Sequence, residues 1–183
     1  TIDTDAEIFY SINGSEFELY ESPLPITEPI KLSVNAVKDG KISQTLTTDF
    51  YKYDKNMSIV LEHQYANEYS AGGNDALIDG MKGTADFRSG SWQGTQKADV
   101  IAMVDLGSPK DIKQIRASFL KDQRSWIFYP KSVTFELYDK NKKLLKTLFQ
   151  QLPETGKEEI TAIHDVNLKT TTKNVRFVKM KAE

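Results

Sequence analysis

The sequence contains no cysteine and only two histidines among its 183 residues. The lack of cysteine excludes a disulfide framework and any site that needs a thiolate as nucleophile or metal ligand. His63 and His164 lie far apart in the sequence, and neither has a neighbouring ligand at the spacing typical of zinc sites. We therefore expect both histidines to be surface or rim residues.

An excess of charge of either sign is also missing. The chain has 24 Lys and Arg residues against 26 Asp and Glu residues, a net charge of -2, so no basic field favours nucleic acid as a partner. The sequence has no apolar run long enough to span a bilayer, so we expect no membrane insertion. The start, TIDTDAEIFYSI, lacks the basic, apolar and small-residue regions of a signal peptide, and we expect a fragment that begins at Thr1.

Short segments with strand character are the main pattern that is present. Ile30, Leu32, Val34 and Ala36 alternate with polar residues, which is typical of a strand with one face on a core. Similar segments recur at 8–12, 45–51, 58–61, 100–106, 112–119, 133–138, 144–149, 160–166 and 174–180, with turn formers such as Gly107-Ser108-Pro109 and Pro153 to Gly156 between them. No window has a sustained helical period. The pattern predicts an all-β fold of sandwich or jelly-roll type.

Two domains are predicted from a polar stretch, YKYDKNM, at Tyr51 to Met57, which separates two sets of strands. We place a small β-sandwich at residues 1–54 and a larger jelly-roll β-sandwich at residues 55–183. The first part is short, so its core must be small.

Residues 8–50 resemble the small fibronectin-like domain near the C-terminus of bacterial chitobiases and β-N-acetylhexosaminidases. The matching residues are Tyr10-Ser11, Asn13 to Glu16, Pro29-Ile30 and Gly40 to Ser43. The sequence departs from the family pattern at Phe17, where proline is usual, which affects the local turn rather than the fold.

Residues 58–183 resemble the discoidin, or coagulation-factor C-type, domain that follows this module in such hexosaminidases. The resemblance rests on YSAGGNDALIDGMKGTADFRSGSWQG (69–94), VIAMVDLG (100–107) and FLKDQRSWIFYPKSVTFELY (119–138). It implies a jelly roll of about eight strands that binds sugars, a fold shared with family 32 carbohydrate-binding modules. The chain stops at VKMKAE, before the last strand of that family, so we expect this strand to be missing.

Two loops carry the residues suited to sugar recognition, which needs flat apolar faces and a few fixed polar groups. Both contain an indole, a guanidinium and an amide, which suggests one convergent site. The predicted carbohydrate-binding residues are Arg88, Trp92, Gln93, Asp122, Arg124, Trp126 and Tyr69. The alternative is that both tryptophans pack inside the protein, above all Trp126 in the apolar run WIFY. Asp122 and Arg124 would then pair with each other on the surface.

The segment ALIDGMKGT (76–84) is similar to the loop that holds a structural calcium ion in discoidin-type modules. By this resemblance, Asp79 and Thr84 would supply side-chain oxygens, and Ala76 and Lys82 would supply backbone carbonyls. The alternative is an ordinary Asp-Gly turn at Asp79.

The resemblances together imply a non-catalytic carbohydrate-binding module of a family 20 glycoside hydrolase-like β-N-acetylhexosaminidase. The implied partners are glycans that contain GlcNAc or galactose and the catalytic domain of the parent enzyme, and the implied location is extracytoplasmic: periplasmic, secreted or on the cell surface. We expect a monomer without enzymatic activity, because a glycosidase needs two carboxyl groups across a cleft, and Glu158 and Glu159 would point to opposite faces of a strand. A structural spacer packed on the catalytic domain and a protein-binding adhesion module are the alternatives.

Overall fold

The structure is a computed structural model that describes residues 5–51, 54–154 and 161–183. Strands dominate these ranges, which confirms the predicted all-β class. The chain divides into two compact units, residues 1–53 with Gly80–Lys82, and residues 54–79 with 83–183. The sequence analysis had assigned Gly80–Lys82 to the second module. The described residues do not include Lys52, Tyr53, Glu158, Glu159 and Ile160. They also do not include the second half of the turn predicted at Pro153 to Gly156.

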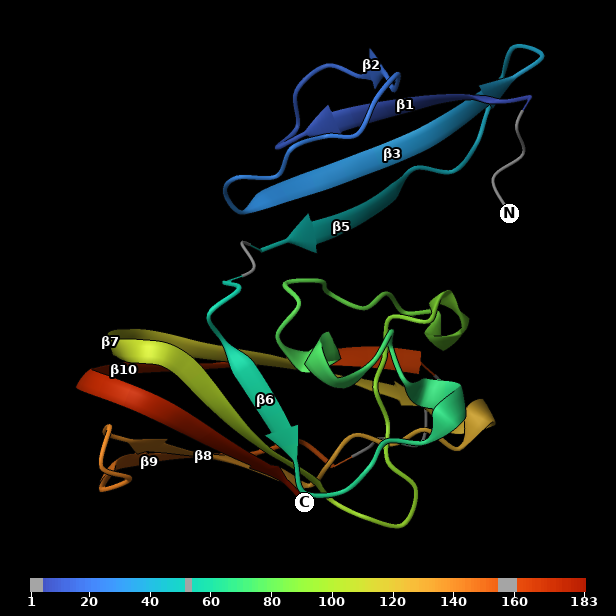
Figure 1. Ribbon diagram of the computed structural model, residues 1–183. Helices are drawn as coiled ribbons and strands as arrows, with labels where there is room; N and C mark the ends of the chain where they lie inside the picture. Colours follow the sequence, from blue (N-terminus) through green and yellow to red (C-terminus); the bar gives the residue numbers. More distant parts are fainter. Residues whose placement is uncertain (1–4, 52–53, 155–160) are drawn as a thin grey trace. The chain divides into compact units, whose positions relative to one another are not determined.

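The first unit is built on one antiparallel sheet (Figure 1). Its strands are β1 (Glu7–Ile12), β2 (Glu18–Leu19), β3 (Ile30–Lys38), β4 (Lys41–Ile42) and β5 (Leu46–Phe50), in the order β2-β1-β3-β4, with β5 also paired to β3. Within residues 5–51, no hydrophobic side chain is fully buried, whereas Ser11 is buried and donates from Oγ to the Ser15 carbonyl at 2.6 Å. The core of this unit is therefore small, as its length predicts.

The second unit contains a five-stranded antiparallel sheet in the order β6-β7-β10-β8-β9. The strands are β6 (Ser58–Leu61), β7 (Val100–Asp122), β8 (Ser132–Tyr138), β9 (Leu144–Gln151) and β10 (Thr161–Ala182). Short 3-10 turns η1 (Asn67–Tyr69), η2 (Asn74–Leu77) and η3 (Phe87–Ser89) precede β7, and η4 (Gln123–Ser125) follows it. No helix in the described ranges has the length and apolar character needed to cross a membrane.

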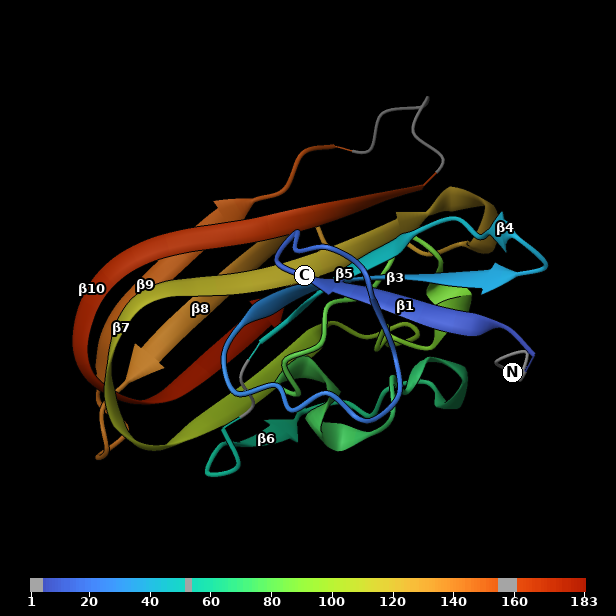
Figure 2. The same cartoon turned by 90° about the horizontal axis from the view of Figure 1, so that it is seen from above.

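The strands β7 and β10 form one long ribbon that bends along its length (Figure 2). They pair from Val100 opposite Ala182 to Asp122 opposite Thr161, with register shifts between Lys169 and Phe177. The sequence analysis predicted four separate strands here and a turn at Gly107. That prediction is wrong, because the register shifts form a bulge, and a bulge bends a strand without ending it.

The bend is held by polar contacts around Gly107. The Gly107 N–H donates to Asp105 Oδ1 at 2.8 Å, and Arg176 Nε lies 2.6 Å from the same carboxylate oxygen. The Arg176 guanidinium also donates to the Gly107 carbonyl. This guanidinium, helped by the Gly107 N–H, holds the pKa of Asp105 below its usual range, against the opposing effect of burial.

The core of the second unit lies between the bent ribbon and β8. Val133, Phe135 and Leu137 are buried at alternate positions of β8, as expected for a strand with one face on a core. The same cluster contains Val166 and Val175 from β10, and partly buried side chains of β7 pack against it. The bent ribbon and β8 thus enclose the core, and η4 follows β7 where the long strand ends at Asp122.

Candidate functional site

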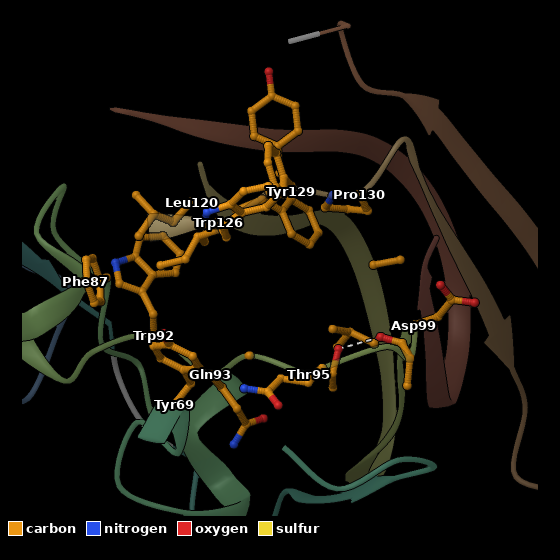
Figure 3. A pocket seen from close by; sticks show the side chains of 18 of the residues that line it. Tyr69, Phe87, Trp92, Gln93, Thr95, Asp99, Leu120, Trp126, Tyr129 and Pro130 are labelled. Carbon is orange, nitrogen blue, oxygen red and sulfur yellow. Dashed lines mark hydrogen bonds between the residues drawn. The ribbon is translucent and has the colours of Figure 1, made fainter. Parts of the chain in front are cut away.

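A hollow of about 410 Å³ opens in the second unit and is lined by residues of several connecting loops (Figure 3). Its aromatic lining consists of Tyr69, Phe87, Trp92, Trp126, Phe128 and Tyr129. Polar side chains from Gln93, Thr95, Gln96, Asp99, Ser118 and Ser125 also line it. The two tryptophan loops therefore share one cavity, the arrangement that the sequence analysis predicted from their similar residues.

Trp92 forms one wall, and its indole is held by contacts with Gly83 and Thr84. Its indole Nε1 donates to the Thr84 carbonyl at 2.6 Å, so the N–H is already used within the protein. A Cβ added at Gly83 would come within 2.3 Å of Trp92 Cε2, which shows that the indole lies directly against this glycine. Trp92 thus offers the hollow an apolar face and no hydrogen-bond donor.

Trp126 stands at the tip of a tightly closed loop and is 85% exposed. Asp122 and Ile127 exchange two backbone hydrogen bonds, at 2.9 and 3.0 Å, and the Asp122 carboxylate accepts from the N–H groups of Arg124 and Ser125. This closure leaves Trp126 in the left-handed region, at φ 57°. The alternative that Trp126 packs inside the protein is wrong, because the loop turns the start of WIFY outward.

Phe128 extends the apolar surface beside Trp126. The two rings meet edge to face, with their centroids 6.5 Å apart, and Phe128 is 53% exposed. Exposed tryptophan of this kind is unusual unless it contacts a ligand or a partner.

Tyr69 and Gln93 are brought together by pairing between their loops. Ser70 and Gln93 form an isolated β-bridge, and the Gly94 N–H donates to the Tyr69 carbonyl at 3.0 Å. The Gln93 amide nitrogen donates to the Gly73 carbonyl at 2.8 Å, so it holds the preceding loop in place. Gln93 therefore supports the wall of the hollow as well as lining it.

Three of the predicted binding residues do not line the hollow. Arg88 is exposed, lies 3.6 Å from Asp86 and stacks over the Phe87 ring at 4.9 Å. The Asp122 carboxylate caps η4 instead of pairing with the Arg124 guanidinium through a salt bridge. Arg124 is exposed. The roles of these residues in sugar binding stay predictions, as do those of the four that do line the hollow.

Sequence reasoning missed the polar side of the hollow. Thr95 and Asp99 belong to the segment TQKAD just before β7, and the Thr95 hydroxyl donates to the Ala98 carbonyl at 2.6 Å. Their sequence signal is only that their segment begins two residues after Gln93, because short polar segments of this composition are common on surfaces.

A surface or rim position was expected for His164, and the structure places it partly buried beside the hollow. Its Nε2 is buried, and its ring lies 5.8 Å from that of Tyr129 between centroids. The paired strand residue Phe119 lines the hollow, which places His164 beside the same wall. His63, in contrast, is exposed as predicted.

Two of the predicted calcium ligands, Thr84 and Lys82, take part in other contacts. The Thr84 hydroxyl lies 3.2 Å from both the Asp86 carbonyl and the Ser89 hydroxyl, and the Lys82 carbonyl accepts from Thr48 at 3.4 Å. In the described part of the chain, no group of three or more His, Asp or Glu side chains is placed to hold a metal ion. Calcium at Ala76, Asp79, Lys82 and Thr84 stays a prediction.

Comparison with known proteins gives limited similarity. No family model matches the sequence, and no curated protein matches it. The solved structures that resemble the chain include two at 14% sequence identity. The lectin domain of lectinolysin complexed with Lewis B antigen has a TM-score of 0.44 over 68% of this chain and 80% of that chain. A histidine mutant of the lectin binding domain of lectinolysin complexed with Lewis b has a TM-score of 0.42 over 69% and 79%. Likeness of this degree carries no argument about function, which must rest on the hollow.

Proposed function

We propose that this chain is a non-catalytic carbohydrate-binding module whose site is the hollow between the two tryptophan loops. The observation that carries the proposal is that Trp92 and Trp126, from separate loops, line the same open cavity. Aromatic faces pack well against the C–H faces of a pyranose ring, and nearby polar groups can bind its hydroxyls. The cavity volume of about 410 Å³ falls in the range of roughly 300–1,000 Å³ found for small-molecule sites.

The module would act by holding an attached enzyme near its substrate. A small site that binds one or two sugar units has a Kd on the order of millimolar, about -4 kcal/mol. Tethering raises the effective concentration of the catalytic domain at the glycan, so weak binding is sufficient. The sequence resemblance supports an accessory role in an extracytoplasmic β-N-acetylhexosaminidase-like enzyme that acts on glycans with GlcNAc or galactose. The chain alone should not hydrolyse an aryl glycoside.

The rival function is a structural or adhesive module that docks on protein, either its own catalytic domain or another partner. The strong exposure of Trp126 and Phe128 favours this rival, because neighbouring exposed aromatic side chains also occur at protein interfaces. The two functions differ in one respect that is easily measured: the rival requires no affinity for a soluble sugar.

Calorimetric titration with methyl glycosides of GlcNAc and galactose tests the proposal. Trp126→Ala should weaken binding at least about fivefold, because stacking on one aromatic side chain is worth roughly 1–3 kcal/mol when the ring is a nucleic-acid base, and a sugar ring is expected to behave similarly. Phe149→Ala is the matched control, since Phe149 is 59% exposed on β9 of the same unit and does not line the hollow. Absence of binding by the parent protein, or equal losses in both variants, would contradict the proposal.

A further inference from the structure

The lining of the hollow has a one-sided charge. It includes the acidic residues Asp99 and Glu183 but, among the described residues, no lysine, arginine or histidine. The two arginines that the sequence analysis placed in the site, Arg88 and Arg124, are exposed and do not line the cavity. The site therefore offers carboxylate acceptors without any cation that would pair with a negatively charged ligand.

Asp99 is held at a defined place in this lining. It immediately precedes β7, which begins at Val100, and the Thr95 to Ala98 hydrogen bond closes the turn before it. Figure 3 shows Asp99 on the side of the hollow opposite Phe87 and Trp92. Asp99 and Trp92 thus lie on opposite sides of the hollow.

We infer that the hollow selects uncharged or positively charged sugars and excludes sugars with a carboxylate, with Asp99 as the residue that sets this preference. The inference rests on the proposed function. A uronic acid would bring a second negative charge into a partly enclosed site with no basic partner. A neutral sugar donates its hydroxyl hydrogens to the carboxylate. A 2-amino sugar adds an ammonium group, which both the carboxylate and the aromatic faces attract.

The test is a titration of the full chain at low salt with matched methyl glycosides in the gluco and galacto series. Each series contains the neutral sugar, its N-acetylamino form, its 2-amino form and its uronate. Within any series that binds, the uronate should bind about three- to tenfold more weakly than the neutral sugar, because the charges interact across a largely solvated gap. The 2-amino sugar should bind more tightly than the neutral one by a factor in the same range.

The variant Asp99→Asn removes the charge at this position. The affinities for the neutral sugar, the 2-amino sugar and the uronate should then become similar. Asp75→Asn is the control, because Asp75 is an exposed carboxylate on η2 that does not line the hollow. Uronates that bind as tightly as neutral sugars, or a preference unchanged in Asp99→Asn, would overturn this inference and leave the proposed function standing. If no member of either series binds, the proposed function itself is overturned.

Discussion

Replacement of Trp126 by glycine should separate the binding role of this side chain from any role in folding. The residue is 85% exposed and has a φ of 57°, so it contributes little to the core and occupies a conformation that favours glycine. We expect Trp126→Gly to lose sugar affinity while the domain keeps its stability.

The magnitude follows from three opposing effects. With 15% of the residue covered, which is the remainder of the 85% exposed, the lost burial costs about 1 kcal/mol for a side chain of roughly 250 Å². Relief of the left-handed conformation returns about 1–2 kcal/mol. The greater freedom of glycine in the unfolded chain costs about 0.5–1 kcal/mol. The free energy of unfolding should therefore change by no more than about 1 kcal/mol.

Urea unfolding and sugar titration of three proteins, the parent, Trp126→Gly and Trp126→Ala, measure this directly. Both variants should lose affinity equally, but the alanine variant should be less stable than the glycine variant by about 1 kcal/mol, because alanine keeps the strain at positive φ. A loss above about 3 kcal/mol in the glycine variant would refute the reasoning, since it would show that the indole supports the fold.

Three further predictions concern the supports of the site and the bend. Gly83→Ala should displace the Trp92 indole, with a stability loss of about 1–3 kcal/mol from overpacking; an unchanged near-ultraviolet circular dichroism spectrum would contradict this. Asp122→Ala should remove the cap of η4, lower the free energy of unfolding by about 1 kcal/mol and weaken sugar binding. Asp122→Asn keeps a hydrogen-bond acceptor and should retain both stability and affinity. If Asp122→Asn instead lost as much affinity as Asp122→Ala, the charge would be in direct contact with the sugar. Asp105→Asn should destabilise the protein by about 1–2 kcal/mol at neutral pH through loss of the Arg176 contact. Because the pKa of Asp105 is lowered in the folded state, its contribution to stability is complete above its unfolded pKa of about 4 and is lost as the pH falls below that value. The difference in unfolding free energy between the parent and Asp105→Asn, measured with urea, should therefore disappear in acid. A difference that is constant with pH would contradict this.

The fold class was predictable because its signal is local. The alternation at Ile30 to Ala36 predicts a strand, and the alternate apolar positions of β8 also fix which of its faces is buried, without knowledge of distant contacts. The continuity of β7 through Gly107 was not predictable in this way. It depends on Asp105 and Arg176, which are far apart in the sequence and meet only once β7 and β10 pair.

The candidate site was predictable in part for a similar reason. Trp92 and Trp126 are rare, large residues that mark their loops, so their convergence was a reasonable hypothesis. The outward position of Trp126 depends on the loop closed by Asp122 and Ile127, whereas composition favours burial of WIFY. Asp99 has a common residue type in a common surface segment, and only the folded arrangement places it on the hollow.

The most direct test of the account is a nuclear magnetic resonance titration that follows the two indole N–H signals, since the chain contains only two tryptophans. We predict that a GlcNAc or galactose glycoside shifts both signals along one saturation curve with a single Kd. Signals that stay in place throughout the titration, or that follow two different curves, would contradict the claim that Trp92 and Trp126 form one sugar-binding site.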